Sequence, residues 1–189
     1  MSSSPRYGET ALLTPANLMT GFRILVAPLF VYLIVIDRVS WWTSLVGFLA
    51  ASSDYFDGIV ARRHGTTTSG AFLDPLADKI LVLGSLYAIV LARPHGVTSF
   101  LVPSILITVR EAWMSYFRSR AARRGISIPA TRIAKWKTFV QDWAIAFCVL
   151  PIAAPHVWLG EVTIWMAVVL TGYTGWRYYV DGRRLLRAR

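Results

Sequence analysis

Long apolar stretches recur from one end of the chain to the other, and only short polar segments separate them. Each stretch is close to the ~20 residues that an α-helix needs to cross the hydrocarbon core of a bilayer. We expect six transmembrane helices, at about residues 20–36, 41–63, 71–92, 97–120, 135–154 and 157–180. Because 55% of the 189 residues are hydrophobic, little is left for a separate soluble domain. The sequence therefore predicts an all-α, polytopic membrane protein with a single domain over residues 1–189.

The N-terminal segment precedes the first apolar stretch. Residues 1–13 are polar, so we expect them to be loose. Thr14 and Pro15 have the pattern of a helix start, with Thr as the N-cap and Pro at the first helical position. We expect a short N-terminal interfacial helix over residues 14–22. A cleaved signal peptide is the alternative for the apolar run that follows, but no small-residue cleavage site comes after it.

Basic residues are distributed unevenly between the predicted loops. Arg38 and Arg93 lie on one side of the membrane in this topology. The other side receives Arg62, Arg63, Arg118, Arg120, Arg123, Arg124, Arg132, Lys135, Lys137 and the arginines of the C-terminal tail. Because cytoplasmic loops carry the excess of Lys and Arg, both termini are predicted to be cytoplasmic, with the protein in the plasma membrane. The net charge of +10 suits an anionic lipid bilayer; no base-reading motif accompanies it, so no nucleic-acid partner is expected.

Four of the ten acidic residues fall within a short segment that ends one predicted helix and begins the next. Asp54 and Asp57 are three residues apart, and Asp74 and Asp78 are four apart. Each pair therefore lies on one helix face, and an antiparallel hairpin brings both pairs to a similar depth. Carboxylates at a membrane boundary repel each other unless a cation neutralises them. Carboxylate oxygens suit a hard ion, so the sequence predicts a site for one or two Mg²⁺ or Mn²⁺ ions.

Small residues continue the helix face that carries Asp54. Gly58 and Ala61 follow it by four and seven residues, so a flat ligand could approach the backbone there. Close packing between membrane helices is the alternative reason for small residues at such positions. Arg62 is either an interface anchor or a contact to phosphate. Helix geometry alone leaves these alternatives open.

The spacing of these residues resembles the signature of the CDP-alcohol phosphotransferase family. Eight fixed positions carry the resemblance: Asp54, Asp57, Gly58, Ala61, Arg62, Gly70, Asp74 and Asp78. The six-helix architecture of that family agrees with the helices predicted above, so the resemblance covers nearly the whole chain. Members of the family displace CMP from a CDP-linked lipid, by attack of an alcohol hydroxyl on the phosphorus attached to the lipid.

The resemblance implies a role for each matching residue. The metal ligands are expected to be Asp54, Asp57, Asp74 and Asp78. The residues expected to border the cytidine diphosphate are Gly58, Ala61, Arg62 and Gly70. Asp78 is also expected to act as the general base, since an attacking alcohol must lose its proton to a group within hydrogen-bond reach. Spacing alone does not separate the roles of Asp74 and Asp78.

Cationic residues in the fourth and fifth predicted helices suggest a pocket for an anion. Arg110 lies deep in the fourth helix, next to Glu111, and Lys135 and Lys137 open the fifth. Intramembrane charges usually face the bundle interior, where these cations could bind an acceptor phosphate. The alternative for Arg110 is pairing with Glu111 or Asp142. For the two lysines it is anchoring at the membrane interface.

These segments resemble the phosphatidylglycerophosphate synthase branch of the family, with Ala134 where that branch has Gly. The branch implies glycerol 3-phosphate as the acceptor. Its phosphate is expected to contact Arg110, Arg118, Lys135 and Lys137. The opening segment also resembles the branch, and its residues expected on the nucleotide side are Asn17, Thr20 and Arg23.

The predicted reaction is transfer of a phosphatidyl group from CDP-diacylglycerol to the hydroxyl of glycerol 3-phosphate, with release of CMP, in phospholipid biosynthesis. Two alternatives keep this chemistry and change the acceptor to an inositol phosphate or to phosphatidylglycerol, as in a cardiolipin synthase. A divalent-cation transporter is a more distant alternative, because it would distribute carboxylates along the bilayer depth. Homodimers are common in the resembled family, so a homodimer is expected as well.

Overall fold

A computed structural model describes the backbone of residues 15–37, 39–64, 68–93, 97–123 and 132–187. Within these ranges, the side chains of residues 15–17, 19, 54–75, 97, 122, 132–135 and 181–187 lie outside the description. The sequence predictions for Asn17, Gly70, Asp74 and Lys135 therefore concern residues whose surroundings are not described. The same holds for the side chains of residues 54–62.

The described residues form six α-helices and one short 3₁₀ helix, with no strand among them. The elements are α1 (Pro15–Asp37), α2 (Trp41–His64), α3 (Thr68–Ala92), α4 (Val97–Ala122), α5 (Arg132–Val149), η2 (Pro151–Ala153) and α6 (Val157–Arg187). The predicted all-α class is therefore confirmed. Most helix ends fall within a few residues of the expected positions, because Gly, Pro and charged clusters mark them in the sequence.

The helix at the N-terminus differs from the prediction. Residues 15–22 are the first two turns of α1, which continues without a break to Asp37. The expectation of a separate interfacial helix over residues 14–22 is therefore wrong for the described part of that segment. Gly21 is the only strong helix breaker between Pro15 and Phe22, and a single glycine costs only ~1 kcal/mol in a helix interior.

The last two long helices also differ from their predicted limits. The α5 helix ends at Val149, and Pro151 begins η2, although the apolar stretch continues to Ala154. Proline lacks the backbone N–H and collides with the carbonyl four residues earlier, which disfavours continuation of a helix. Pro28 in α1 and Pro103 in α4 lie inside helices that continue past them, whereas α5 ends before Pro151. At the other end, α6 runs to Arg187 and not to 180. The basic tail has no proline, and its one glycine, Gly182, costs only ~1 kcal/mol in a helix interior.

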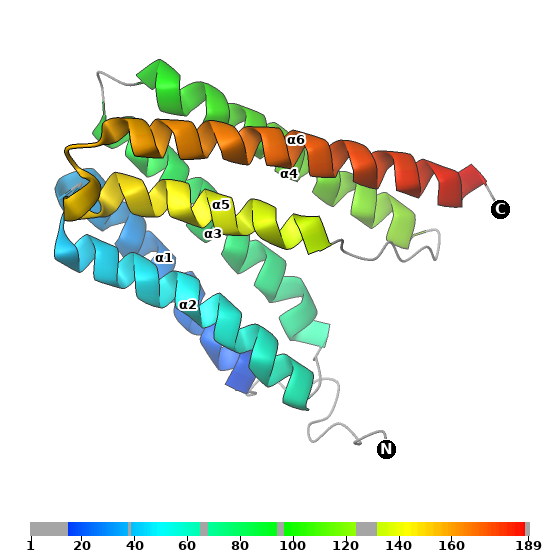
Figure 1. The fold of residues 1–189 in the computed structure, drawn as a ribbon. Helices are drawn as coiled ribbons and strands as arrows, with labels where there is room; N and C mark the ends of the chain where they lie inside the picture. Colours follow the sequence, from blue (N-terminus) through cyan, green and yellow to red (C-terminus); the bar gives the residue numbers. More distant parts are fainter. Residues whose placement is uncertain (1–14, 38, 65–67, 94–96, 124–131, 188–189) are drawn as a thin grey trace.

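The six helices run up and down in a single bundle. Figure 1 shows the start of α1, the end of α2, the start of α3, the end of α4, the start of α5 and the end of α6 at one end of the bundle. We call this the basic end, because it carries Arg118, Arg120, Arg123 and Arg177. The turns between α1 and α2, and between α5 and α6, lie at the opposite end (Figure 1). The chain ends of the bundle therefore share one side, as the loop charges predicted.

The bundle has two halves. In one half α1 packs against α2 and α3; in the other, α6 packs against α4 and α5. The α3 helix also contacts α4 and α5, so it joins the halves. Close approach of α1 and α2 depends on Gly47, where an added Cβ would lie 2.5 Å from the ring of the buried Phe30.

Two helical segments are long and apolar enough to cross a membrane. They are Thr20–Asp37 in α1 and Val157–Val180 in α6, among the residues whose placement is described. Charged residues interrupt several of the other helices, as Arg110 and Glu111 do in α4. This finding covers two of the six predicted membrane-spanning helices.

Candidate active site

The four aspartates occupy matching positions on two successive helices. Asp54 lies ten residues before the end of α2, and Asp78 lies ten residues after the start of α3. With a rise of 1.5 Å per residue, both are about 15 Å from the helix ends that face the α2–α3 connection. Asp57 and Asp74 lie nearer to those ends. The backbone therefore places both pairs at a similar depth below the basic end.

Only one of the four carboxylates has a described side chain. Asp78 is partly buried and takes part in a polar or electrostatic interaction. Among the described side chains, no group of three or more His, Cys, Asp or Glu residues could hold a metal. The side chains of Asp54, Asp57 and Asp74 lie outside the described residues, so their ligand roles stay predictions. The donor set itself, carboxylate oxygens from two helices, suits a hard divalent ion.

The α1 helix supplies a buried cation next to the aspartate-bearing segment of α2. Arg23 is only 1% exposed, and its Nε donates a hydrogen bond of 3.2 Å to Ser53 Oγ. Ser53 directly precedes Asp54 and donates in turn to Ala50 O at 2.7 Å. Thr20, one turn before Arg23, is fully buried. Two of the residues expected on the nucleotide side, Thr20 and Arg23, are therefore buried.

A second polar cluster lies between α4, α5 and α6. Arg110 Nη1 donates to Glu111 Oε1 at 2.9 Å, and Lys137 Nζ donates to the same oxygen. Lys137 is buried and Glu111 is largely buried. The structure therefore brings together two of the residues predicted to bind the acceptor phosphate. It also shows the alternative considered for Arg110, which is pairing with Glu111.

Three residues of α6 fix the guanidinium of Arg110. Its Nε donates to Thr171 O at 3.0 Å, and its Nη2 donates to Thr174 Oγ1 at 2.9 Å. Gly175 leaves the space that the side chain occupies, since a Cβ there would lie 3.1 Å from Arg110 Nε. Sequence reasoning missed these residues. Their importance comes from contact with Arg110, which lies some sixty residues away in the sequence. The only local signal in the sequence is that this part of α6 has small and hydroxyl-bearing side chains.

The structure does not bring Arg118 into this cluster. Its side chain is exposed, and its guanidinium lies over the ring of Tyr178, 5.3 Å from the centroid. Arg118 is eight residues after Arg110, or about 12 Å further along α4 toward the basic end. Lys135 lies in the first turn of α5, two residues before Lys137.

A lysine that the sequence reasoning left out reaches the same part of α4. Lys79, the residue after Asp78, donates through Nζ to Ser115 Oγ. Ser115 Oγ donates to Glu111 O at 2.8 Å, so this contact lies one helical turn from the Glu111 side chain. Gln141 of α5 contributes a longer bond, 3.5 Å from its Nε2 to Thr171 Oγ1. The sequence feature that could have indicated Lys79 is its position directly after Asp78, the last of the four aspartates.

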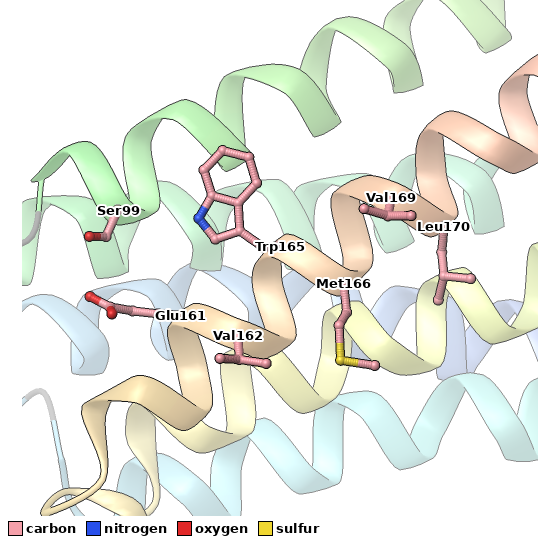
Figure 2. Close-up of a pocket in the computed structure, with 7 residues that line it drawn as sticks. All are labelled: Ser99, Glu161, Val162, Trp165, Met166, Val169 and Leu170. Carbon is pink, nitrogen blue, oxygen red and sulfur yellow. The ribbon is translucent and has the colours of Figure 1, made fainter.

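A groove of about 660 Å³ lies elsewhere, on the outer face of α4 and α6. Figure 2 shows the residues that line it: Ser99, Glu161, Val162, Trp165, Met166, Val169 and Leu170. Its lining is mostly apolar and includes one carboxylate and no cation. The residues come from the first turn of α4 and the first half of α6, away from the basic end. The groove therefore lacks the chemistry needed to bind a diphosphate or a phosphorylated alcohol.

Comparison with known proteins gives a consistent result. The family described as CDP-alcohol phosphatidyltransferase matches residues 13–173. A CDP-diacylglycerol–glycerol-3-phosphate 3-phosphatidyltransferase of Rickettsia typhi is 34% identical over 86% of this chain and 93% of its own length. A probable phosphatidylglycerophosphate synthase of Mycobacterium tuberculosis is 34% identical over 97% of this chain and 90% of its own length. A CDP-diacylglycerol–glycerol-3-phosphate 3-phosphatidyltransferase of Wigglesworthia glossinidia brevipalpis is 29% identical over 84% of this chain and 93% of its own length.

Proposed function

Because the chain belongs to the CDP-alcohol phosphatidyltransferase family, we propose that it transfers the phosphatidyl group of CDP-diacylglycerol to glycerol 3-phosphate and releases CMP. The observation that carries the proposal is the likeness over nearly the full length to enzymes named for this reaction. The buried pairing of Arg110 and Lys137 on one carboxylate supports it, because it gathers cationic side chains that could bind a phosphorylated acceptor. The enzyme is thus a transferase of phospholipid biosynthesis.

The reaction exchanges one bond to phosphorus for another. The hydroxyl oxygen of glycerol 3-phosphate forms a bond to the phosphorus that carries diacylglycerol, and the bond from that phosphorus to the CMP oxygen breaks. The Asp78 carboxylate accepts the hydroxyl proton as attack proceeds. Its partly buried position on α3, level with Asp54 on α2, supports this role. Phosphoryl-type transfer depends more on positioning and charge neutralisation than on covalent help from the protein.

The residues that would hold the metal are Asp54, Asp57, Asp74 and Asp78. Their matched positions on α2 and α3, and their all-oxygen donor set, suit one or two ions of Mg²⁺ or Mn²⁺. When bound, such an ion neutralises the diphosphate and the charge that develops on the departing CMP. Arg23 adds a buried positive charge on the α1 side of the same region.

The nucleotide would lie against the α1–α2 side of the aspartates. Thr20 and Arg23 are buried there, and Asn17 is one turn earlier on α1. Gly58 and Ala61 follow Asp54 on α2, and their small size would let the diphosphate approach the backbone there. Arg62 and Gly70 flank the α2–α3 connection and complete the predicted set of contacts to the CDP-lipid.

The acceptor phosphate would bind on the other side of α3. Arg110 and Lys137 share one Glu111 oxygen, so the three side chains carry a net positive charge. Hydrogen bonds to Thr171 and Thr174 hold Arg110 in place before any ligand arrives. A phosphate dianion that approaches this cluster meets prearranged donors, which lowers the cost of ordering them. Arg118 at the basic end, and Lys135 two residues before Lys137 on α5, would attract the anion toward the cluster.

All six helices are proposed to span the plasma membrane. The outer surface of the bundle is strongly apolar: Leu25 and Phe48 are largely exposed, whereas Arg23, Lys137 and Gln141 are buried among the core residues. An exposed apolar surface of this extent is typical of contact with lipid. On α6, the exposed Trp158 and Trp176 are separated by about 27 Å, close to the thickness of the hydrocarbon core. The excess of Arg at the basic end supports a cytoplasmic location for that end, the termini and the proposed active site.

An acceptor panel tests this proposal. The purified protein is incubated in mixed micelles with CDP-diacylglycerol and either glycerol 3-phosphate, an inositol phosphate or phosphatidylglycerol. We expect CMP release and a phosphatidylglycerophosphate product with glycerol 3-phosphate, and at least about tenfold lower rates with the others. A higher rate with inositol phosphate or phosphatidylglycerol would assign the enzyme to a different branch of the same chemistry.

A further inference from the structure

Lys79 connects the helix that carries Asp78 to the helix that carries Glu111. The lysine is the next residue after Asp78 on α3, and its side chain is partly buried. Its ammonium donates to Ser115 Oγ on α4, and Ser115 donates to the backbone oxygen of Glu111 at 2.8 Å. The ammonium therefore lies beside α4, one turn from the carboxylate that Arg110 and Lys137 share.

The charges in this cluster do not balance. The hydrogen-bonded group of described residues contains three cations, Lys79, Arg110 and Lys137, and one carboxylate, Glu111. Its formal charge is therefore +2. Glu111 is already shared by two of the cations, and the partner of Lys79 is a neutral hydroxyl that occupies one of the three ammonium donors. A partly buried ammonium in this situation favours an anionic partner.

The size of the proposed acceptor makes the position of Lys79 informative. In glycerol 3-phosphate the attacking hydroxyl and the phosphorus are separated by roughly 6 Å at full extension. If Asp78 takes the proton of that hydroxyl, the phosphate must bind within that distance of it. The residue adjacent to Asp78, with a flexible side chain directed toward α4, is well placed to contact the phosphate.

We propose that Lys79 binds the phosphate of the acceptor alcohol and thereby selects a phosphorylated acceptor over an uncharged one. The inference rests on the proposed function and extends it, because Lys79 joins the donor side of the site to the Arg110–Glu111–Lys137 cluster. In the ligand-free enzyme Ser115 holds the ammonium, and the phosphate replaces this neutral partner. The alternative is that Lys79 only ties α3 to α4.

Steady-state kinetics of the full-length protein in mixed micelles separate the two roles. Lys79→Gln removes the charge and keeps a donor for Ser115. We expect it to raise the KM for glycerol 3-phosphate about tenfold or more, because a charge-assisted hydrogen bond is lost. The KM for CDP-diacylglycerol should change less than about twofold, and Lys79→Arg should recover part of the loss.

Ser115→Ala is the matched control, since it breaks the tie between α3 and α4 and leaves the charge in place. We expect it to raise the KM for glycerol 3-phosphate less than about threefold. Equal effects of Ser115→Ala and Lys79→Gln would show that Lys79 is a tie between helices and would overturn the inference. An unchanged KM in Lys79→Gln would do the same.

Inhibition by inorganic phosphate gives a second readout. Lys79→Arg keeps the charge, and Lys79→Met replaces Lys79→Gln if the latter does not fold. Phosphate should compete with glycerol 3-phosphate in the original protein and in Lys79→Arg. It should require about tenfold higher concentrations in Lys79→Gln, or in Lys79→Met if that variant is the one that folds. If the original protein forms no product from glycerol 3-phosphate, the proposed function itself fails. If the original protein forms product, and phosphate inhibits Lys79→Gln or Lys79→Met at the same concentration as the original protein, only the assignment of Lys79 fails.

Discussion

At the residue scale, the carboxylate of Glu111 determines how the two cations beside it are arranged. Arg110 and Lys137 come from different helices and both donate to Glu111 Oε1. Without that oxygen, two positive charges would remain close together in a largely buried place. Removing one partner from a buried ionic group usually costs far more than the net contribution of the group to stability.

Glu111→Gln should therefore destabilise the protein. We expect a loss on the order of 3 kcal/mol, because the neutral amide cannot balance Arg110 and Lys137. Thermal unfolding of the purified protein in detergent measures the change. Glu161→Gln, in the outer groove, is the control and should unfold within about 1–2 °C of the original protein. A Glu111→Gln variant as stable as that control would show that the cluster does not depend on its carboxylate.

Asp78→Asn should lower turnover at least about 100-fold, since an amide cannot accept the proton of the attacking hydroxyl. Binding of CDP-diacylglycerol, measured by retention of the labelled lipid, should persist at a substantial level. Asp37→Asn is the matched control, because Asp37 lies at the opposite end of the bundle. Near-normal turnover in Asp78→Asn would remove it from the role of base.

The sequence predicted part of this site and not the rest. The aspartate spacing is local, so helix periodicity predicted that each pair lies on one face of its own helix. The antiparallel hairpin predicted a similar depth for both pairs, and the backbone positions on α2 and α3 agree with that depth. Arg110 and Lys137 were recognisable because charges deep in apolar helices are uncommon and need a reason. Thr171, Thr174 and Gly175 were not predictable, because their importance arises only where α6 meets α4. For Arg118, the contact with Tyr178 of α6 likewise depends on tertiary packing.

At the element scale, the helix limits follow backbone chemistry more closely than hydropathy. Hydropathy extended the fifth helix to residue 154, whereas Pro151 ends it at Val149. At the N-terminus, residues 15–22 look interfacial by composition, yet α1 includes them without a break. An apolar-to-polar transition marks a change of environment, and it need not coincide with a helix end.

The close contact of α1 and α2 gives an element-scale prediction. Gly47→Leu should collide with the buried Phe30 ring and destabilise the protein by about 1–3 kcal/mol. Gly172→Leu is the matched control, since nothing lies within 4 Å of a Cβ at that helical position. Melting temperatures in detergent measure both. Equal melting temperatures for the two variants would contradict a tight α1–α2 contact at Gly47.

At the scale of the whole molecule, the bundle has chemically different ends. The aspartate pairs, Lys79, Arg118 and both chain ends of the bundle lie toward one end, whereas the exposed Trp41 and Trp42 mark the other. The residues proposed for the active site come from helices of both halves, and α3 contacts helices of each half. This arrangement follows from an even number of antiparallel helices, which the sequence predicted from the count of apolar stretches.

Labelling of single cysteines tests the proposed orientation. Cys148, the only cysteine, is buried and should not react. Ser119→Cys, exposed near the basic end, should react with a membrane-impermeant maleimide only in inverted membrane vesicles. His156→Cys, exposed at the opposite end, should react only in right-side-out vesicles. Labelling of both cysteines from the same side would contradict six antiparallel spans.

The central claim is that metal-bound carboxylates at the basic end direct the phosphatidyl group to glycerol 3-phosphate. The most direct test supplies the purified protein with CDP-diacylglycerol and labelled glycerol 3-phosphate, removes divalent ions with EDTA, and then restores Mg²⁺ or Mn²⁺. We predict no turnover with EDTA and, after restoration, one labelled phosphatidylglycerophosphate for each CMP released. CMP release without labelled lipid, or full activity in EDTA, would contradict the claim.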